Sequence, residues 1–266
     1  MNYTNSPLAD IVNLSEGYTK GRKYGNTEYK LDTITIHCFV GQVTAKRGAE
    51  VFKPKSKNAS CNYVVGYDGS IALVVEEKNR SWCTGGDIKN NGLTGSLNDY
   101  RACTIEVASD NFKPYAVTNE AYEALIKLVV DICRRNDIKS LVWSGKKEDR
   151  INHKYGCNMT VHRDYATKSC PGDFLYGLMP EIARRVNAEL KGTIINPKPI
   201  VGPTVNVEPE EVKEERLYKV QPGDYLGKIA KNLNTTVNKL VELNKAKYPS
   251  LAVNKNLIRV GWLLKY

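Results

Sequence analysis

The chain lacks three features that would place it in other protein classes. No stretch of the 266 residues approaches the roughly 18 consecutive apolar residues of a membrane span. The N-terminus, MNYTNSPLADIVNLSEGY, has no basic segment followed by an apolar run, so we expect no secretory signal. The seven cysteines are odd in number, irregularly spaced and without a CxxC pair, which indicates a reduced intracellular protein rather than a disulfide scaffold.

Acidic residues are fewer than basic ones. Lys and Arg together number 39 against 29 Asp and Glu, giving a net charge of +10. Such a balance favours a polyanionic partner, which could be nucleic acid, a membrane surface or an acidic cell wall. Charge alone does not choose among these, and it is equally consistent with a role in solubility only.

Proline is concentrated in one segment. The stretch 191–216, KGTIINPKPIVGPTVNVEPEEVKEER, holds four of the 11 prolines and shows no helical or strand period. We therefore expect an extended linker there. It would separate a domain at 1–190 from a C-terminal module at 217–266.

The first domain alternates predicted strands and helices. Strands are indicated at 33–40 and 102–109, and the Asp68-Gly69 pair predicts a hairpin over 61–75. Apolar residues at helical spacing predict a helix over 119–136 and a second after Pro171-Gly172. This mixture predicts an α/β domain with a mixed sheet and helices on its faces.

Histidine is rare, with only three in the chain. His37 closes the predicted strand TITIH, and His162 lies eight residues before Cys170 in VHRDYATKSC. A catalytic zinc takes three protein ligands and keeps a fourth position for water, which two histidines and a thiolate would satisfy. The spacing by itself does not distinguish such a site from a structural His–Cys pair.

The blocks around these residues are more specific. TITIHCF, CNYVVGYDGSI and MTVHRDYATKSCPGD, in this order, resemble the type-2 N-acetylmuramoyl-L-alanine amidases, which include peptidoglycan-recognition proteins and phage endolysins. The resemblance covers roughly residues 30 to 190. It implies a Zn²⁺ enzyme that cleaves the amide between N-acetylmuramic acid and L-alanine in peptidoglycan, with His37, His162 and Cys170 as ligands.

The same resemblance implies two catalytic residues. Lys168 stands two positions before the third ligand, and Glu106 lies in the TIEVAS strand. A lysine near the metal can stabilise an oxyanion, and a carboxylate can move the proton of a water molecule to the leaving amine. The alternatives are a solvated loop charge for Lys168 and a surface ion pair for Glu106.

Tyr63, His153 and Trp82 lie within or between these blocks. The phage lysozyme of this family needs a tyrosine at the start of the hairpin, but Cys61 and Asn62 occupy that place, and Tyr63 should face the other side of its strand. His153 matches no family ligand and is expected either at the surface or facing the substrate. Trp82 is expected either to line a sugar-binding cleft or to pack in the core.

In the C-terminal module, LYKV and GWLLKY indicate strands, and the segments around Tyr225 and Leu240 indicate helices. The predicted order is therefore strand–helix–helix–strand. YKVQPGDYLGKIA, LVELN and NLIRVGWLLKY resemble the LysM module, which binds N-acetylglucosamine polymers. The resemblance implies binding residues at Asp224, Tyr225, Leu226 and Asn244. Nine basic against two acidic residues give this module 9 − 2 = +7, which suits an anionic wall, and no nucleic-acid motif accompanies the charge.

The predicted function is therefore a lytic endolysin or autolysin. We expect cytoplasmic accumulation followed by release to the wall or non-classical secretion, with a Gram-positive and anaerobic host suggested by charge and thiols. A non-catalytic peptidoglycan-binding protein of the same fold is the alternative. A muropeptide-recycling amidase is a third reading, which the binding module disfavours because anchoring gains nothing on a soluble substrate.

Overall fold

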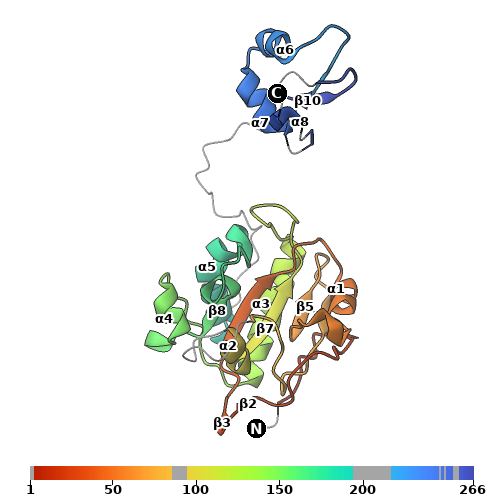
Figure 1. The fold of residues 1–266 in the computed structure, drawn as a ribbon. Coiled ribbons are helices and arrows are strands. Elements are labelled where there is room, and N and C mark those ends of the chain that lie inside the picture. Colours follow the sequence, from red (N-terminus) through yellow and green to blue (C-terminus); the bar gives the residue numbers. More distant parts are fainter. Residues whose placement is uncertain (1–2, 86–94, 194–216, 246, 249, 254–257) are drawn as a thin grey trace. The chain divides into compact units, whose positions relative to one another are not determined.

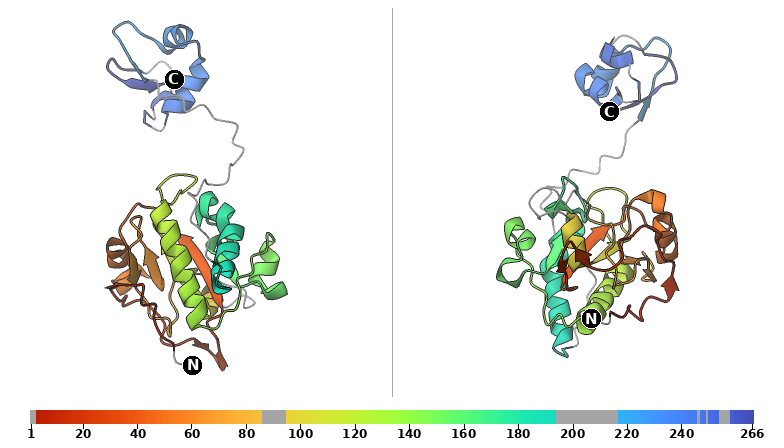
Figure 2. Two further views of the ribbon diagram at one scale, coloured as in Figure 1. Left: turned by 180° about the vertical axis from the view of Figure 1, so that it is seen from behind. Right: turned by 60° about the horizontal axis from the view of Figure 1, so that its bottom comes forward.

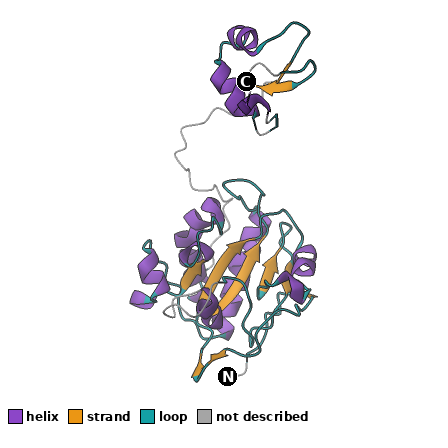
Figure 3. Cartoon of the chain, viewed as in Figure 1, coloured by secondary structure: helices purple, strands orange, loops and turns teal. Residues whose placement is uncertain are grey.

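The computed structural model describes residues 3–85, 95–193, 217–245, 247–248, 250–253 and 258–266. The chain forms two compact units, Met1–Thr204 and Val205–Tyr266. The first unit contains both helices and strands (Figure 3). Among the described residues no helix is long and apolar enough to cross a bilayer. Most of the predicted linker 191–216 lies outside the described residues.

A six-stranded mixed sheet forms the centre of the first unit (Figure 1). Its order is β1 (Ile11–Val12), β6 (Ile71–Leu73), β5 (Tyr63–Val65), β7 (Ala102–Val107), β4 (Thr33–Cys38) and β8 (Met159–Val161). Only the β5–β6 hairpin is antiparallel; the other neighbouring strands in this order run parallel. The Asp-Gly prediction is confirmed, since Gly69 takes a φ of +81° in the turn between β5 and β6.

The two faces of the sheet differ in chemistry. In β4, Ile34 and Ile36 join the main apolar core, so Thr35 and His37 point to the other face. That other face is polar near the middle of the sheet. Thr35 bonds Thr160 at 2.8 Å between their hydroxyl oxygens. The alternation therefore directs His37 away from the apolar core.

Helices cover the apolar face. α3 (Asn119–Arg135) and α5 (Gly172–Leu190) lie side by side across it (Figure 2, left). Their buried residues, including Leu125, Val129, Leu178 and Ile182, join the core cluster, as their spacing predicts. α1 (Ala45–Phe52) packs on the opposite face through a smaller cluster with β5 and β6.

Shorter elements complete the first unit. They are β2 (Lys23–Tyr24), β3 (Thr27–Glu28), η1 (Lys55–Lys57), α2 (Gly95–Arg101), α4 (Lys147–Ile151), η2 (Lys154–Gly156) and η3 (His162–Asp164). The sequence patterns predicted none of these, nor α1, β1 or β8. Two to eight residues are too few for an apolar period to show.

The second unit pairs β9 (Leu217–Lys219) with β10 (Leu263–Lys265) in antiparallel fashion. Between them in the chain come α6 (Leu226–Asn232) and α7 (Val237–Asn244). The Thr236 hydroxyl caps the N-terminus of α7. The predicted strand–helix–helix–strand order is present with one addition, the short helix α8 (Ser250–Val253). Tyr248, just before α8, stacks on Trp262 with ring centroids 4.0 Å apart.

Candidate metal centre

The site lies at the carboxyl ends of three adjacent parallel strands. His37 is near the end of β4, Glu106 lies directly opposite it on β7, and His162 follows β8 at once. The carboxyl edge of a parallel sheet is where such folds gather functional side chains. Cys170 reaches the same place from the loop before α5, although it lies 133 residues from His37 in the chain.

The three predicted ligands come together. The donor atoms of His37, His162 and Cys170 all lie within 4.8 Å of one another. Cys170 Sγ is 3.5 Å from Nδ1 of His37, and the two imidazole rings meet edge to face with centroids 5.1 Å apart. The predicted set of three therefore forms one cluster of metal-ligating groups.

Electrostatics suit a cation at this cluster. Burial, and then the proximity of His162, holds the pKa of His37 well below its ordinary value. Burial, and then Lys168, lowers the pKa of His162. Both rings are therefore neutral at pH 7, the form that binds metal. A thiol–thiol hydrogen bond with Cys38 and burial raise the pKa of Cys170, so cation binding must displace its proton.

Glu106 lies beside this cluster. Burial raises the pKa of Glu106 to about 8, so the carboxyl can both hold and release a proton near neutral pH. Its Oε1 accepts from Cys83 Sγ at 3.8 Å. Its buried Oε2 has no hydrogen-bond partner among the described residues. His37, Cys83 and Glu106 form a second, overlapping group of potential ligands.

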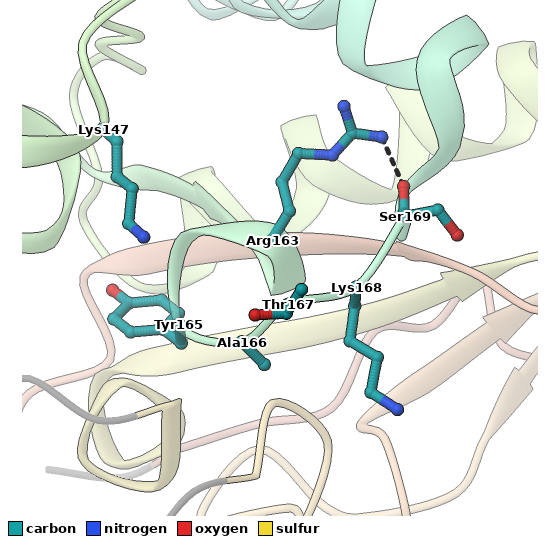
Figure 4. A pocket seen from close by; sticks show the side chains of 7 residues that line it. All are labelled: Lys147, Arg163, Tyr165, Ala166, Thr167, Lys168 and Ser169. Atoms are coloured by element: carbon teal, nitrogen blue, oxygen red, sulfur yellow. Dashed lines mark hydrogen bonds between the residues drawn. The ribbon is translucent and has the colours of Figure 1, made fainter.

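Lys168 lies on the rim of an open pocket of about 490 Å³ (Figure 4). The pocket is lined by Lys147, Arg163, Tyr165, Ala166, Thr167, Lys168 and Ser169, of which three are basic and none acidic. Arg163 donates to the Ser169 carbonyl, which fixes the loop between His162 and Cys170. Lys168 is exposed to solvent.

Asp164 stabilises the turn that carries His162. Both side chains of the Arg150–Asp164 ion pair are 1% exposed, and the carboxylate also accepts from the Val161 N–H at 3.1 Å. No sequence pattern pairs Asp164 with Arg150, which lies 14 residues before it.

Other predicted residues lie elsewhere. Tyr63 is fully buried in the apolar face, where its hydroxyl accepts from Ser6 and donates to Glu77 at 2.6 Å. His153 joins neither of the two metal-ligating groups found among the described residues, and its Nδ1 lies 2.9 Å from the Cys157 carbonyl oxygen. Trp82 is half-buried, with its indole N–H donated to Thr19 at 2.9 Å.

In the second unit the four predicted binding residues differ in exposure. Tyr225 is 62% exposed and available to a ligand. Leu226 is buried in the small core. Asn244 bonds the backbone of Leu240 and Lys265, and Asp224 accepts from Tyr218 and the Gln221 N–H. Asp224 therefore closes the turn that precedes Tyr225, whereas Leu226 belongs to the small core and Asn244 joins α7 to β10.

Sequence reasoning missed two residues beside the centre. Thr84 Oγ1 lies 3.4 Å from Nε2 of His37 and 2.6 Å from Oδ1 of the buried Asp99. No local pattern pointed to them, because their link to His37 crosses 47 residues.

Comparison with known proteins gives two family matches. The family model described as N-acetylmuramoyl-L-alanine amidase matches residues 27–173, and the LysM domain model matches residues 218–265. No curated protein matches the chain.

Several solved structures are similar at low identity. A mutant endolysin from Bacillus subtilis is 16% identical, with 66% of this chain and 97% of that chain covered and a TM-score of 0.45. The amidase LysC from Clostridium intestinale URNW is 17% identical over 65% of this chain and 97% of its own, with a TM-score of 0.40. The Ph2119 endolysin from a Thermus scotoductus bacteriophage is 15% identical, with 65% of this chain and 98% of that chain covered and a TM-score of 0.40.

Proposed function

The chain belongs to the N-acetylmuramoyl-L-alanine amidase family, and we propose that it hydrolyses its peptidoglycan substrate with a zinc ion held by His37, His162 and Cys170. The family reaction cleaves the amide between N-acetylmuramic acid and L-alanine. The observation that carries the zinc proposal is the gathering of two neutral imidazoles and one thiol within 4.8 Å. Two nitrogens and one sulfur are ligands that suit catalytic zinc.

The chain's own groups divide the remaining work. A bound zinc would supply Lewis acidity and lower the pKa of a water molecule. Glu106 would hold the proton during the reaction, because its pKa of about 8 lies close to neutral pH and its Oε2 is unpartnered. A positioned general acid–base of this kind contributes typically about 10²–10⁴-fold to a rate.

Lys168 would stabilise negative charge on the substrate oxygen. Its ammonium stands on the loop between two proposed ligands and is close enough to His162 to lower that ring's pKa. A preorganised cation there favours the tetrahedral intermediate of acyl transfer. The adjoining basic pocket would receive acidic groups of the peptidoglycan peptide. Trp82 remains a proposed contact to the sugar.

The C-terminal unit adds attachment to the substrate. A LysM domain binds peptidoglycan, and we propose that this one does so through the Tyr225 loop. We further propose the organisation 1–190 for the catalytic domain, 191–216 for a linker and 217–266 for the binding module. An enzyme of this design acts at the bacterial cell wall as an endolysin or autolysin, which it would reach from the cytoplasm.

The decisive experiment is digestion of purified cell walls with and without a chelator. We expect new L-alanine amino termini, no new reducing sugars and loss of activity on chelation. Cys170→Ser should lose both zinc and activity, whereas Glu106→Gln should keep stoichiometric zinc and lose activity. Zinc retained by Cys170→Ser would exclude Cys170 as a ligand. An inactive wild-type protein that still binds walls would instead favour a binding protein of the same fold.

The role of the second unit is tested by removing 191–266. We expect weaker binding to whole walls and unchanged turnover of small soluble muropeptides, because the catalytic cluster lies wholly in the first unit. An equal loss on both substrates would contradict this division of labour.

A further inference from the structure

The buried carboxylate of Asp99 fixes residues 83 and 84, and Thr84 contacts the Nε2 side of the His37 ring. Asp99, on α2, is fully buried, and its Oδ2 accepts from the backbone N–H groups of Cys83 at 3.0 Å and Thr84 at 2.9 Å. Its Oδ1 accepts from the Thr84 hydroxyl at 2.6 Å. Three hydrogen bonds to one carboxylate thus fix both the backbone and the side-chain rotamer of Thr84.

A count of protons gives the direction of the next hydrogen bond. A threonine hydroxyl has one hydrogen to donate, and an ionised carboxylate has none. The short bond to Asp99 uses the hydrogen of Thr84, so the same oxygen can only accept from its other neighbour. That neighbour is Nε2 of His37, 3.4 Å away, which must therefore carry a hydrogen.

The tautomer of His37 follows. A neutral imidazole has one N–H and one lone pair. With the hydrogen on Nε2, the lone pair is on Nδ1, and Nδ1 is the atom that lies 3.5 Å from Cys170 Sγ. The lone pair is thereby directed into the cluster of three candidate ligands.

We propose that Thr84 and Asp99 are positioning residues for the metal centre, which fix His37 in the Nε2–H tautomer and keep its Nδ1 available as a ligand. This inference rests on the proposed zinc site. Metal-binding histidines generally donate their second N–H to a carboxylate, a carbonyl or water, and the interaction orients the ring. Here the Thr84 hydroxyl lies between the Asp99 carboxylate and the His37 ring and hydrogen-bonds to both.

The test uses the full chain with Thr84→Val, which removes the hydroxyl and keeps the branched shape. Thr84→Ser is the matched control because it retains the hydroxyl. Zinc affinity is measured by competition with a chromogenic chelator. We expect Thr84→Val to weaken zinc binding by about 10–100-fold, and Thr84→Ser to stay within a few-fold of wild type. Wild-type zinc affinity in Thr84→Val would overturn the proposal.

A second measurement needs neither a variant nor the metal. The ¹⁵N chemical shifts of the His37 ring in the metal-free wild-type protein distinguish the two tautomers. Nε2–H is expected, and Nδ1–H would overturn the proposal even if the variants did not fold. A wild-type protein that shows Nε2–H but binds no zinc would refute the proposed zinc site alone. Zinc bound equally by wild type and Thr84→Val would refute the positioning role alone.

Discussion

Removal of the Asp164 carboxylate should destabilise the catalytic unit strongly. Asp164 accepts two hydrogen bonds from Arg150, at 2.9 Å from Nε and 2.5 Å from Nη2, and both side chains are 1% exposed. It also accepts from Val161, directly before His162. Asp164→Ala would leave a buried guanidinium without its counter-charge and free the turn that carries a proposed ligand.

The magnitude can be worked from these contacts. Removing one partner of a buried ion pair costs about 3–5 kcal/mol. Arg150 keeps the Ser144 carbonyl, the Tyr176 hydroxyl and the face of Trp143, 4.2 Å from its ring centroid, so the loss should lie near the lower end. For a unit of this size, about 3 kcal/mol lowers the Tm by roughly 6–12 °C.

Calorimetry of the full chain measures this loss with an internal control. The transition of Val205–Tyr266 should not move, because Asp164 belongs to the other unit. Asp173→Ala is the matched variant: it breaks the Arg163–Asp173 pair, whose carboxylate is 53% exposed, and should cost less than about 1 kcal/mol. Equal effects of Asp164→Ala and Asp173→Ala would refute the reasoning from burial.

Two further predictions concern buried groups near the sheet. Burial raises the pKa of Asp99 from 3.8 to about 6. The contribution of its protonated form to the free energy of unfolding is therefore fully present below pH 3.8 and is lost as the pH rises through 6. This loss amounts to roughly 3 kcal/mol. Asp99→Asn should flatten the measured free energy of unfolding over that pH window, and an unchanged slope would contradict the assignment. Tyr63→Phe should lower the free energy of unfolding by about 1–3 kcal/mol and leave kcat/KM unchanged, because the hydroxyl serves Ser6 and Glu77. A tenfold loss of kcat/KM with unaltered stability would instead give Tyr63 a part in catalysis.

The sequence predicted the long elements of the fold well. The apolar spacing of 119–136 and the Asp68-Gly69 turn are local signals, and the structure places a helix at Asn119–Arg135 and a hairpin around Gly69. β1 and β8 have only two or three residues, and their places in the sheet are determined by tertiary pairing. The addition of α8 to the second unit likewise comes from a segment without an apolar period.

Some residues of the candidate site could likewise be identified from the sequence, and others only from the structure. His37, His162 and Cys170 lie in blocks that a family resemblance can identify, and the structure gathers them within 4.8 Å. Thr84, Asp99 and Arg150 act through hydrogen bonds to residues 14 to 47 positions away. Their side chains carry no pattern of their own, so only the folded chain shows what they support.

The parallel pairing of β4 and β7 has a consequence for when the enzyme becomes dangerous to the cell that makes it. His37 and Glu106 face each other only in one register, and a slip of one residue would turn either side chain toward the apolar core. Cys170, 133 residues after His37, is the last of the set to be synthesised. A nascent chain that ends before it has no complete donor set. Under the proposed zinc site such a chain should not be lytic, whereas a chain that lacks only 191–266 should keep its turnover of small muropeptides.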